Sequence, residues 1–126
     1  MNAHKIRSII IWAVSVMSTI TMAAAVAAPT FPTGKYNAGG ISIQFDDHGH
    51  VRVSQGDRSL VDGQFLANAD QIKLTDESGP MACSKDEESG TYRWKYEDEA
   101  LSFSKLNDRC DGRSGDLIGR QWKKEK

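Results

Sequence analysis

The segment Gly90–Cys110, GTYRWKYEDEALSFSKLNDRC, decides the fold because it contains two alternating stretches joined by an acidic turn. Tyr92, Trp94 and Tyr96 occupy every second position, and an apolar–serine alternation follows the EDE sequence. Alternation of this kind is typical of strands that bury one face. The segment is therefore predicted to be a β-hairpin whose aromatic face forms part of the wall of a β-protein.

The same alternation recurs along the chain and predicts eight short strands, at residues 34–37, 41–45, 50–55, 60–67, 71–75, 91–96, 101–106 and 117–122. No helical periodicity of useful length follows Ala27. Consecutive short strands without helices favour an all-β, eight-stranded antiparallel up-and-down meander barrel, because closure removes exposed strand edges. The interior of such a barrel is either filled by side chains or holds one small ligand.

The alternation also predicts which side chains face the interior. The inward set is Tyr36, Ile41, Ile43, Phe45, Val51, Val53, Val61, Phe65, Ile72, Leu74, Tyr92, Trp94, Tyr96, Leu101, Phe103 and Leu117. The closing KKEK is expected to be a solvated end of the chain.

The beginning of the chain reads as a secretory signal peptide. Lys5 and Arg7 precede an apolar run, and Ala25-Val26-Ala27 supplies the small-residue pattern of a cleavage site. An uncleaved membrane anchor is the alternative, but the apolar run is short for a bilayer span of about 20 residues. We expect residues 1–27 to be removed and residues 28–126 to form one lipocalin-like β-barrel domain.

Charge and composition limit the partners. The formal charge of the whole chain is −1, and it falls to −3 once Lys5 and Arg7 are removed. Acidic and basic residues are interspersed, whereas a nucleic-acid-binding domain needs a clustered basic face. The expectation is a periplasmic or secreted monomer that has no stable membrane anchor after signal cleavage and does not bind nucleic acid.

Cys83 and Cys110 are the two cysteines of the chain. In an exported protein a pair of cysteines most simply forms one structural disulfide, which would contribute about 3.5 kcal/mol by restricting the unfolded chain. Two separate thiols or a redox pair are the alternatives, but no C-x-x-C sequence is present.

The two ends of the predicted barrel carry Gly34-Lys35-Tyr36 and Gly119-Arg120-Gln121-Trp122. This pairing resembles the calycin superfamily of lipocalin-like and avidin-like barrels, in which an arginine of the last strand covers an aromatic residue of the first. The resemblance implies that Tyr36 and Arg120 form a barrel-closing pair, with Tyr36 in the place of the tryptophan that the family carries. Cation–π attraction makes such a pair physically reasonable.

Further motifs are D-x-I-x-L-T-D-E-x-G-x-x-x-C from Asp70 to Cys83, G-T-Y-x-W from Gly90, L-x-F from Leu101 and D-x-C-x-x-R from Asp108. Together they resemble small exported bacterial lipocalin-like domains of unassigned function. The resemblance covers nearly all of residues 28–126 and implies a fold rather than a function.

The inward aromatic stripe suggests a ligand pocket, and plain core packing is its alternative. The predicted lining is Phe45, Val53, Phe65, Tyr92, Trp94 and Phe103. The expected function is non-covalent binding of a small, mainly apolar molecule. The alternative is a protein-interaction module, such as an inhibitor of an extracytoplasmic hydrolase, that acts through its loops at residues 84–89 and 111–116.

Catalytic and metal sites receive little support. His48 and His50 beside two aspartates invite a metal, but no third sequence-linked ligand accompanies them, and a solvated turn is the simpler interpretation. The NDRCDGRSGD sequence does not fit a calcium-binding loop, so its acids are expected to cap turns or to form exposed pairs with Arg109 and Arg113, each contributing under about 1 kcal/mol. No catalytic motif is present, and we expect no enzyme activity, cofactor or metal.

Overall fold

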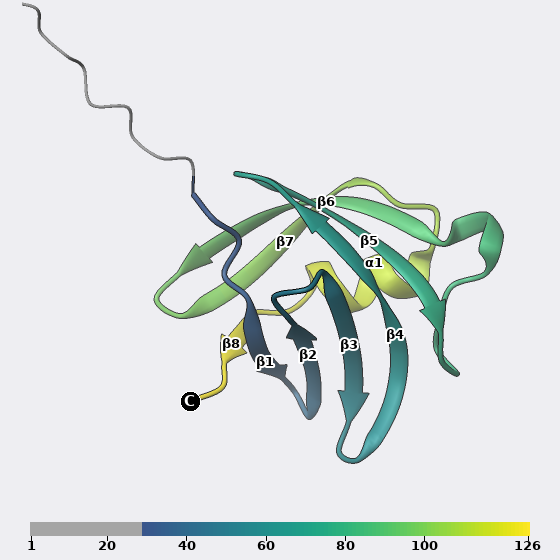
Figure 1. The fold of residues 1–126 in the computed structure, drawn as a ribbon, viewed down its shortest axis with the longest axis horizontal. Helices are drawn as coiled ribbons and strands as arrows, with labels where there is room; N and C mark the ends of the chain where they lie inside the picture. Colours follow the sequence, from purple (N-terminus) through teal and green to yellow (C-terminus); the bar gives the residue numbers. More distant parts are fainter. Residues whose placement is uncertain (1–28) are drawn as a thin grey trace, which may run out of the picture.

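The computed structural model describes residues 29–126. The predicted signal peptide and its cleavage site lie outside the described residues. The described chain begins with a short segment at residues 29–33 and then enters the first strand (Figure 1).

The structure is a closed antiparallel barrel in which each strand pairs with the next in sequence and β8 pairs with β1 (Figure 1). The strands are β1 (Gly34–Ala38), β2 (Ile41–Phe45), β3 (His50–Gln55), β4 (Arg58–Ala67), β5 (Gln71–Ser78), β6 (Ser89–Glu97), β7 (Ala100–Asn107) and β8 (Trp122–Lys124). A 3-10 helix, η1 (Lys85–Glu87), precedes β6, and a helix, α1 (Asp111–Ile118), precedes β8. The predicted all-β meander barrel is confirmed.

Strand alternation places the expected side chains inside. Tyr36, Ile43, Phe45, Val51, Ile72, Leu74, Tyr92, Leu101 and Phe103 belong to the buried core, and Ile41, Val53, Phe65, Trp94 and Tyr96 pack against it while partly exposed. Cross-strand register brings facing residues together, as with Trp94 of β6 opposite Phe103 of β7. Pairs of this kind are the units that stabilise a sheet.

The prediction for the last strand is wrong. Residues 117–122 were expected to be extended, but Leu117 lies on α1 and the strand begins only at Trp122. Gly112 and Gly115 lower the helix propensity of this segment, so its sequence looks like a loop. The helix forms because it buries Ser114 and Leu117, three residues apart on one face, against the barrel.

The expected solvated tail is also wrong in part, because Lys123 and Lys124 belong to β8. β8 joins β7 through Trp122 and Lys123, and it joins β1 through Lys123 and Lys124. The Lys124 amide donates to the Glu99 carbonyl at 2.9 Å. A short strand of paired lysines therefore completes the barrel while their side chains stay exposed.

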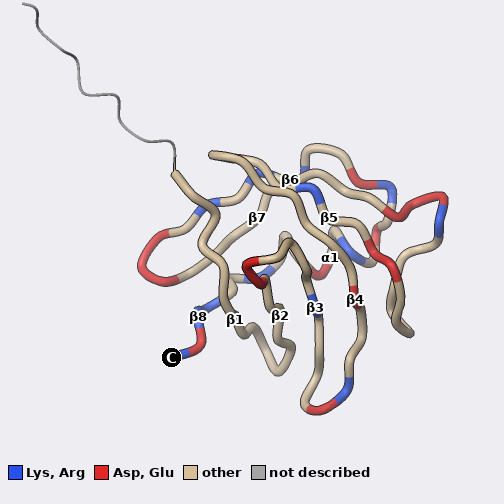
Figure 2. The backbone as a smooth tube through the Cα atoms, in the orientation of Figure 1, with Lys and Arg blue, Asp and Glu red and all other residues tan. Residues whose placement is uncertain are grey.

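The meander gives the barrel two unlike ends, since successive connections alternate between them. The β1–β2 and β3–β4 turns, the β5–β6 connection with η1, and α1 lie at one end, which we term the α1 end. The segment at residues 29–33 and the β2–β3, β4–β5 and β6–β7 turns lie at the other, which we term the N-terminal end (Figure 1). The β2–β3, β4–β5 and β6–β7 turns at the N-terminal end carry acidic and no basic residues, whereas acidic and basic positions are interspersed around the α1 end (Figure 2).

Candidate ligand-binding cavity

A cavity of about 390 Å³ lies at the α1 end, between strands β2–β5 and α1. Its wall is mainly aliphatic and is formed by Ile41, Ile43, Val51, Val53, Leu60, Val61, Leu74, Met81, Ala82, Leu117 and Trp122. Residues of α1 and of the segment at residues 81–83 form part of its wall. Its size and lining match those of sites that bind small molecules.

The polar residues of the cavity divide into two groups. Asp76 and Arg113 have buried side chains that already bind one another, whereas Gln55, Arg58 and Asp116 are exposed. The Met81 side chain, 61% exposed, also belongs to the lining. The cavity thus combines an apolar interior with exposed polar and apolar residues at its border, an arrangement suited to a ligand with a small polar part.

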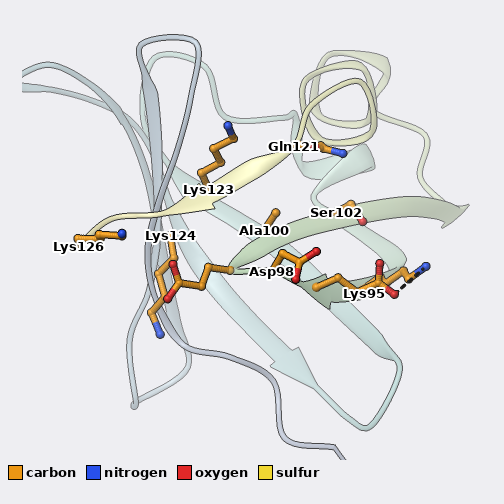
Figure 3. Close-up of a pocket in the computed structure, with 10 residues that line it drawn as sticks. Lys95, Asp98, Ala100, Ser102, Gln121, Lys123, Lys124 and Lys126 are labelled. Carbon is orange, nitrogen blue, oxygen red and sulfur yellow. Dashed lines mark ion pairs between the residues drawn. The ribbon is translucent and has the colours of Figure 1, made fainter.

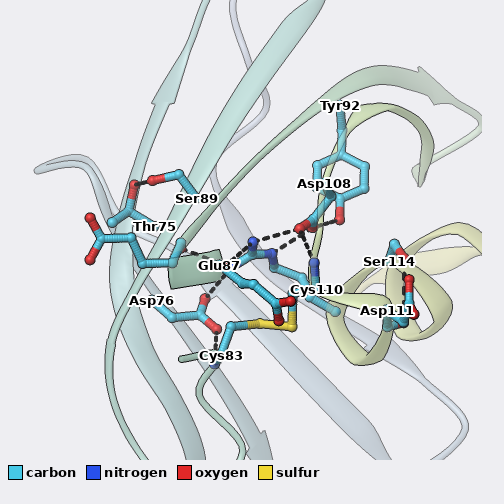
Figure 4. Close-up of polar contacts among 12 residues, drawn as sticks. Thr75, Asp76, Cys83, Glu87, Ser89, Tyr92, Asp108, Cys110, Asp111 and Ser114 are labelled. Carbon is cyan, nitrogen blue, oxygen red and sulfur yellow. Dashed lines mark hydrogen bonds and ion pairs between the residues drawn. A yellow bond between two sulfur atoms is a disulfide. The ribbon is translucent and has the colours of Figure 1, made fainter. Parts of the chain in front are cut away.

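Arg113 organises a buried polar cluster, the arginine clasp, formed by Arg113, Asp108, Asp76 and Tyr92 (Figure 4). Arg113 Nε and Nη2 donate to the two carboxylate oxygens of Asp108 at 2.7 Å each, and the Tyr92 hydroxyl donates to Asp108 Oδ2. The side chain of Asp108 is fully buried. A bidentate arginine–carboxylate pair combines two charge-assisted hydrogen bonds, which are stronger than bonds between neutral groups.

The remaining donors of Arg113 reach the β5–β6 connection. Nη1 donates to the Glu88 carbonyl and Nη2 to the Glu87 carbonyl, both at 2.9 Å, while Nη1 also lies 3.2 Å from Asp76 Oδ1. Asp76 accepts in addition from the amide of Cys83 at 2.8 Å. Four hydrogen bonds and the ion pair with Asp76 therefore hold the guanidinium of Arg113. The predicted pairing of Asp108 with Arg113 is confirmed, but the expectation that it is weak and exposed is wrong because both side chains are buried.

Burial and hydrogen bonding set the ionisation of the clasp. Burial alone would raise the pKa of Asp108, but hydrogen bonds from Arg113, Tyr92 and the Cys110 amide together hold that pKa below its usual range. Burial, and then the hydrogen bond to Asp108, raise the pKa of the Tyr92 hydroxyl well above its usual value. At neutral pH the clasp consequently holds an ionised carboxylate and a neutral tyrosine that donates its proton to it.

The disulfide Cys83–Cys110 is confirmed, with its sulfurs 2.02 Å apart, and both cysteines line the cavity. It joins the β5–β6 connection to the start of α1, which are the segments that Arg113 also joins. Gly90 lies beneath the clasp, where an added Cβ would overlap Asp108 Oδ2. The clasp, the disulfide and Gly90 together hold α1 in place as one wall of the cavity.

The six residues predicted to line a pocket divide between different places. Val53 lines the cavity, and Tyr92 belongs to the clasp. The other four pack among aromatic rings, with Phe45 5.2 Å from Phe65 and 6.4 Å from Phe103 between ring centroids. Trp94 donates its indole N–H to the Asn68 carbonyl at 3.1 Å. The structure therefore brings the predicted aromatic stripe together as packed rings and opens its cavity at the aliphatic end.

The predicted barrel-closing residues both lie where β1 meets the end of the chain. Tyr36 is fully buried, donates its hydroxyl to the Pro32 carbonyl at 2.6 Å and has its pKa raised to about 12, mainly by burial. Arg120 Nη1 donates to the Ala38 carbonyl at 3.3 Å, so Arg120 does bind β1. Stacking of the guanidinium on the Tyr36 ring stays a prediction.

Sequence reasoning missed two of the buried aromatic residues. Phe31 precedes the first strand, so no alternation marks it, and Trp122 follows a helix that the sequence pattern did not indicate. Trp122 is 1% exposed, lines the cavity and donates its indole N–H to the Leu117 carbonyl at 3.3 Å. A large aromatic residue just before the first strand and another in the last strand were the available signals, since such residues are seldom left exposed.

A second hollow, of about 460 Å³, lies over the exposed positions of β6, β7 and β8 (Figure 3). Its lining is charged, with four lysines and three acids, and Lys95 pairs with Glu97 at 3.2 Å. Exposed pairs of this type are strongly solvated and contribute little. A mainly apolar ligand would therefore find its partners in the cavity at the α1 end and not on this surface.

The metal hypothesis receives no geometric support within residues 29–126. His50 Nδ1 lies 3.2 Å from Asp46 Oδ2, and the amides of His48 and His50 donate to Asp46 Oδ1. No group of three or more histidine, cysteine or acidic side chains is arranged to hold a metal in this part of the chain. Asp46 instead organises the β2–β3 turn as a hydrogen-bond acceptor.

Between residues 29 and 126, no helix has the length and apolar character needed to cross a membrane. No family model, curated protein or solved structure matches the chain.

Proposed function

We propose that the protein is an exported, lipocalin-like binding protein that holds one small, mainly apolar molecule in the cavity at the α1 end, without catalysis. The observation that carries this proposal is the aliphatic cavity of about 390 Å³ within a closed barrel. Burial of an apolar molecule there would remove apolar surface from water on both partners, at about 25 cal/mol per Å². The disulfide supports an oxidising, extracytoplasmic location.

The proposed site differs from the one expected from the sequence because most of the aromatic rings predicted to line a pocket pack against one another. The rings of Phe45 and Phe65 contact one another, whereas the aliphatic side chains near α1 border open volume. A ligand that fills open volume gains dispersion contacts without displacing protein groups. The α1 end therefore offers the more favourable location for an apolar ligand.

Gly112 gives a direct test of this site. It lines the cavity, and an added Cβ would meet no atom within 4 Å, so Gly112→Leu should place its side chain in the cavity without a clash. We expect affinity for the neutral dye N-phenyl-1-naphthylamine to fall by at least about tenfold, which corresponds to 1.4 kcal/mol of lost binding. Fluorescence titration of the purified variant measures the loss.

Gly115→Leu is the matched control, because Gly115 lies on the same helix, has the same free space and is absent from the cavity wall. Both substitutions replace a helical glycine with leucine, a residue of higher helix propensity. Equal dye affinity in both variants would exclude the cavity. The natural ligand is sought separately by intact mass measurement of natively purified protein, where an excess mass lost on denaturation indicates a bound molecule.

A protein-interaction role is the second candidate, favoured by one observation. The two segments expected to contact a partner are residues 84–89 and residues 111–116, and the second was predicted as a loop but lies on α1. Arg113 joins them, and the disulfide flanks them. They carry Asp86, Glu88 and Asp111 as exposed acids, which would complement a basic extracytoplasmic hydrolase.

This second role predicts that Asp86→Lys weakens association with a basic cell-wall hydrolase by about tenfold or more, mainly by slowing association. Asp70→Lys, an equal charge change in the β4–β5 turn at the N-terminal end, should leave the association rate nearly unchanged. Surface plasmon resonance at low and high salt compares the two. Equal losses for both variants would mean that net charge alone acts, and would remove the loops from consideration.

A further inference from the structure

The N-terminal end of the barrel contains a ring that no strand supplies. Phe31 belongs to the segment at residues 29–33, which precedes β1, yet only 7% of Phe31 is exposed. Sheet pairing begins at Gly34, opposite Phe45 of β2. Phe31 therefore enters the barrel from outside the sheet. We term the Phe31 ring the plug, and the segment at residues 29–33 that carries it the strap.

The plug sits in a socket formed by Phe45 of β2, Phe65 of β4 and Trp94 of β6. The centroid of the Phe31 ring lies 4.9 Å from that of Phe45, 5.6 Å from that of Phe65 and 5.3 Å from that of Trp94. The contacts with Phe45 and Trp94 are edge-to-face, at 75° and 88°. Such contacts recognise an aromatic ring through its quadrupole, whichever molecule carries the ring.

The strap has few polar attachments. The Tyr36 hydroxyl donates to the Pro32 carbonyl at 2.6 Å, and the Thr33 hydroxyl donates to Asp47 Oδ1 at 3.1 Å. The socket residues, by contrast, stand on strands with a full ladder of neighbours. Withdrawal of Phe31 would leave the socket residues in place, because residues 29–33 take no part in the strand pairing of the barrel.

An open groove of about 580 Å³ runs beside the plug. Its floor includes Phe31, Phe65 and Ala67, and its border includes the carboxylates of Asp46 and Asp47. No lysine or arginine is among the residues that line it. A ligand that reaches the socket through the groove therefore passes the carboxylates of Asp46 and Asp47. Their negative charge attracts a cationic ligand and repels an anionic one.

We infer that the N-terminal end is a second binding site, specific for a small aromatic amine, in which the ligand ring replaces Phe31 in the socket and the ammonium group lies beside Asp47. Phe31 is then an internal competitor that occupies the site when the amine is absent. This site is separate from the cavity at the α1 end and does not depend on the function proposed there.

The two indole N–H groups of the barrel report its two ends independently. Trp94 donates to the Asn68 carbonyl near the socket, whereas Trp122 donates to the Leu117 carbonyl at the α1 cavity. Titration of isotopically labelled protein with 2-phenylethylamine should shift the Trp94 indole resonance in NMR spectra and leave that of Trp122 unchanged. A shift of Trp122 alone would place the amine in the other cavity and overturn the inference.

Displacement of the plug is measured in the same sample. Nuclear Overhauser contacts between the rings of Phe31 and Trp94 should disappear at saturation and be replaced by contacts between the ligand ring and Trp94. Persistence of the Phe31 contacts in the saturated complex would contradict displacement. This measurement uses the unaltered protein, so it stands even if a variant fails to fold.

Two variants separate the ring from the charge. Phe31→Ala removes the competitor and should tighten 2-phenylethylamine binding at least about tenfold, whereas Leu117→Ala, which empties space at the α1 end, should not. Asp47→Asn should weaken binding of 2-phenylethylamine and leave binding of neutral ethylbenzene unchanged. Unaltered affinity in Phe31→Ala, or equal loss of both ligands in Asp47→Asn, would refute the respective part of the inference.

Discussion

Replacement of Arg113 by methionine should lower the free energy of unfolding by about 3 to 5 kcal/mol, the usual effect of removing one partner of a buried ion pair. The side chain of Arg113 is 7% exposed, and that of Asp108 is fully buried. Without the guanidinium, the Asp108 carboxylate would keep its hydrogen bonds from Tyr92 and the Cys110 amide but lose its compensating charge. The Glu87 carbonyl would lose the donor that Arg113 provides, and the Glu88 carbonyl would keep only its bond from the Asp76 amide.

Urea denaturation of the disulfide-bonded protein, followed by tryptophan fluorescence, measures this loss. Arg52→Met is the matched control, because Arg52 is 64% exposed in its side chain and pairs at 2.7 Å with Asp62, which is 39% exposed. That control should lose only a small part of this amount from its ion pair, because exposed pairs contribute little. Similar losses for the two variants would show that the clasp contributes no more than an exposed pair.

Removal of the disulfide should have the second largest effect. Cys83 and Cys110 are 27 positions apart, and restriction of a loop of that length in the unfolded chain is worth about 3.5 kcal/mol, within a general range of about 2 to 5 kcal/mol. The double variant Cys83→Ala/Cys110→Ala should lose stability by this amount. Because the disulfide also borders the cavity, dye binding at the α1 end should weaken in parallel.

Reduction of the unaltered protein provides a control that involves no substitution. The reduced protein and the double alanine variant should unfold at nearly the same urea concentration, well below that of the oxidised protein. Coincident midpoints for the oxidised and reduced proteins would contradict the expected stabilisation by the disulfide. The disulfide and the arginine clasp join the same segments, so the losses of stability on removing each are not expected to be additive.

Several residues of the motifs that carry the resemblance to small exported lipocalin-like domains meet at one place in the structure. Asp76, Gly90, Tyr92, Asp108 and Arg113 all belong to the clasp or contact it. The motifs therefore describe how the β5–β6 connection and α1 are held against the barrel. A pattern of this kind specifies a fold closely and says little about the ligand, whose cavity is bordered mainly by interchangeable aliphatic residues.

Seven of the eight strands could be predicted from the sequence, because alternation over a few residues reports directly which face of a strand is buried. The partners Cys83 and Cys110 could be predicted because no other cysteine competes. Of the predicted pocket lining, Val53 borders the cavity and the aromatic rings lie elsewhere. Periodicity shows that a side chain points inward, but it does not show whether the interior near it is filled.

Tertiary structure alone decided the remaining features, each of which depends on contacts between residues far apart in the chain. Helix α1 contains two glycines and forms because its buried face and Arg113 find partners on β5, β7 and the β5–β6 connection. Phe31 becomes a plug only because three strands supply its socket. The sequence by itself determined an alternating chain that closes into a barrel, since strand periodicity is a local property. The location of the cavity depended on which segments, distant in the sequence, cover each end of the barrel.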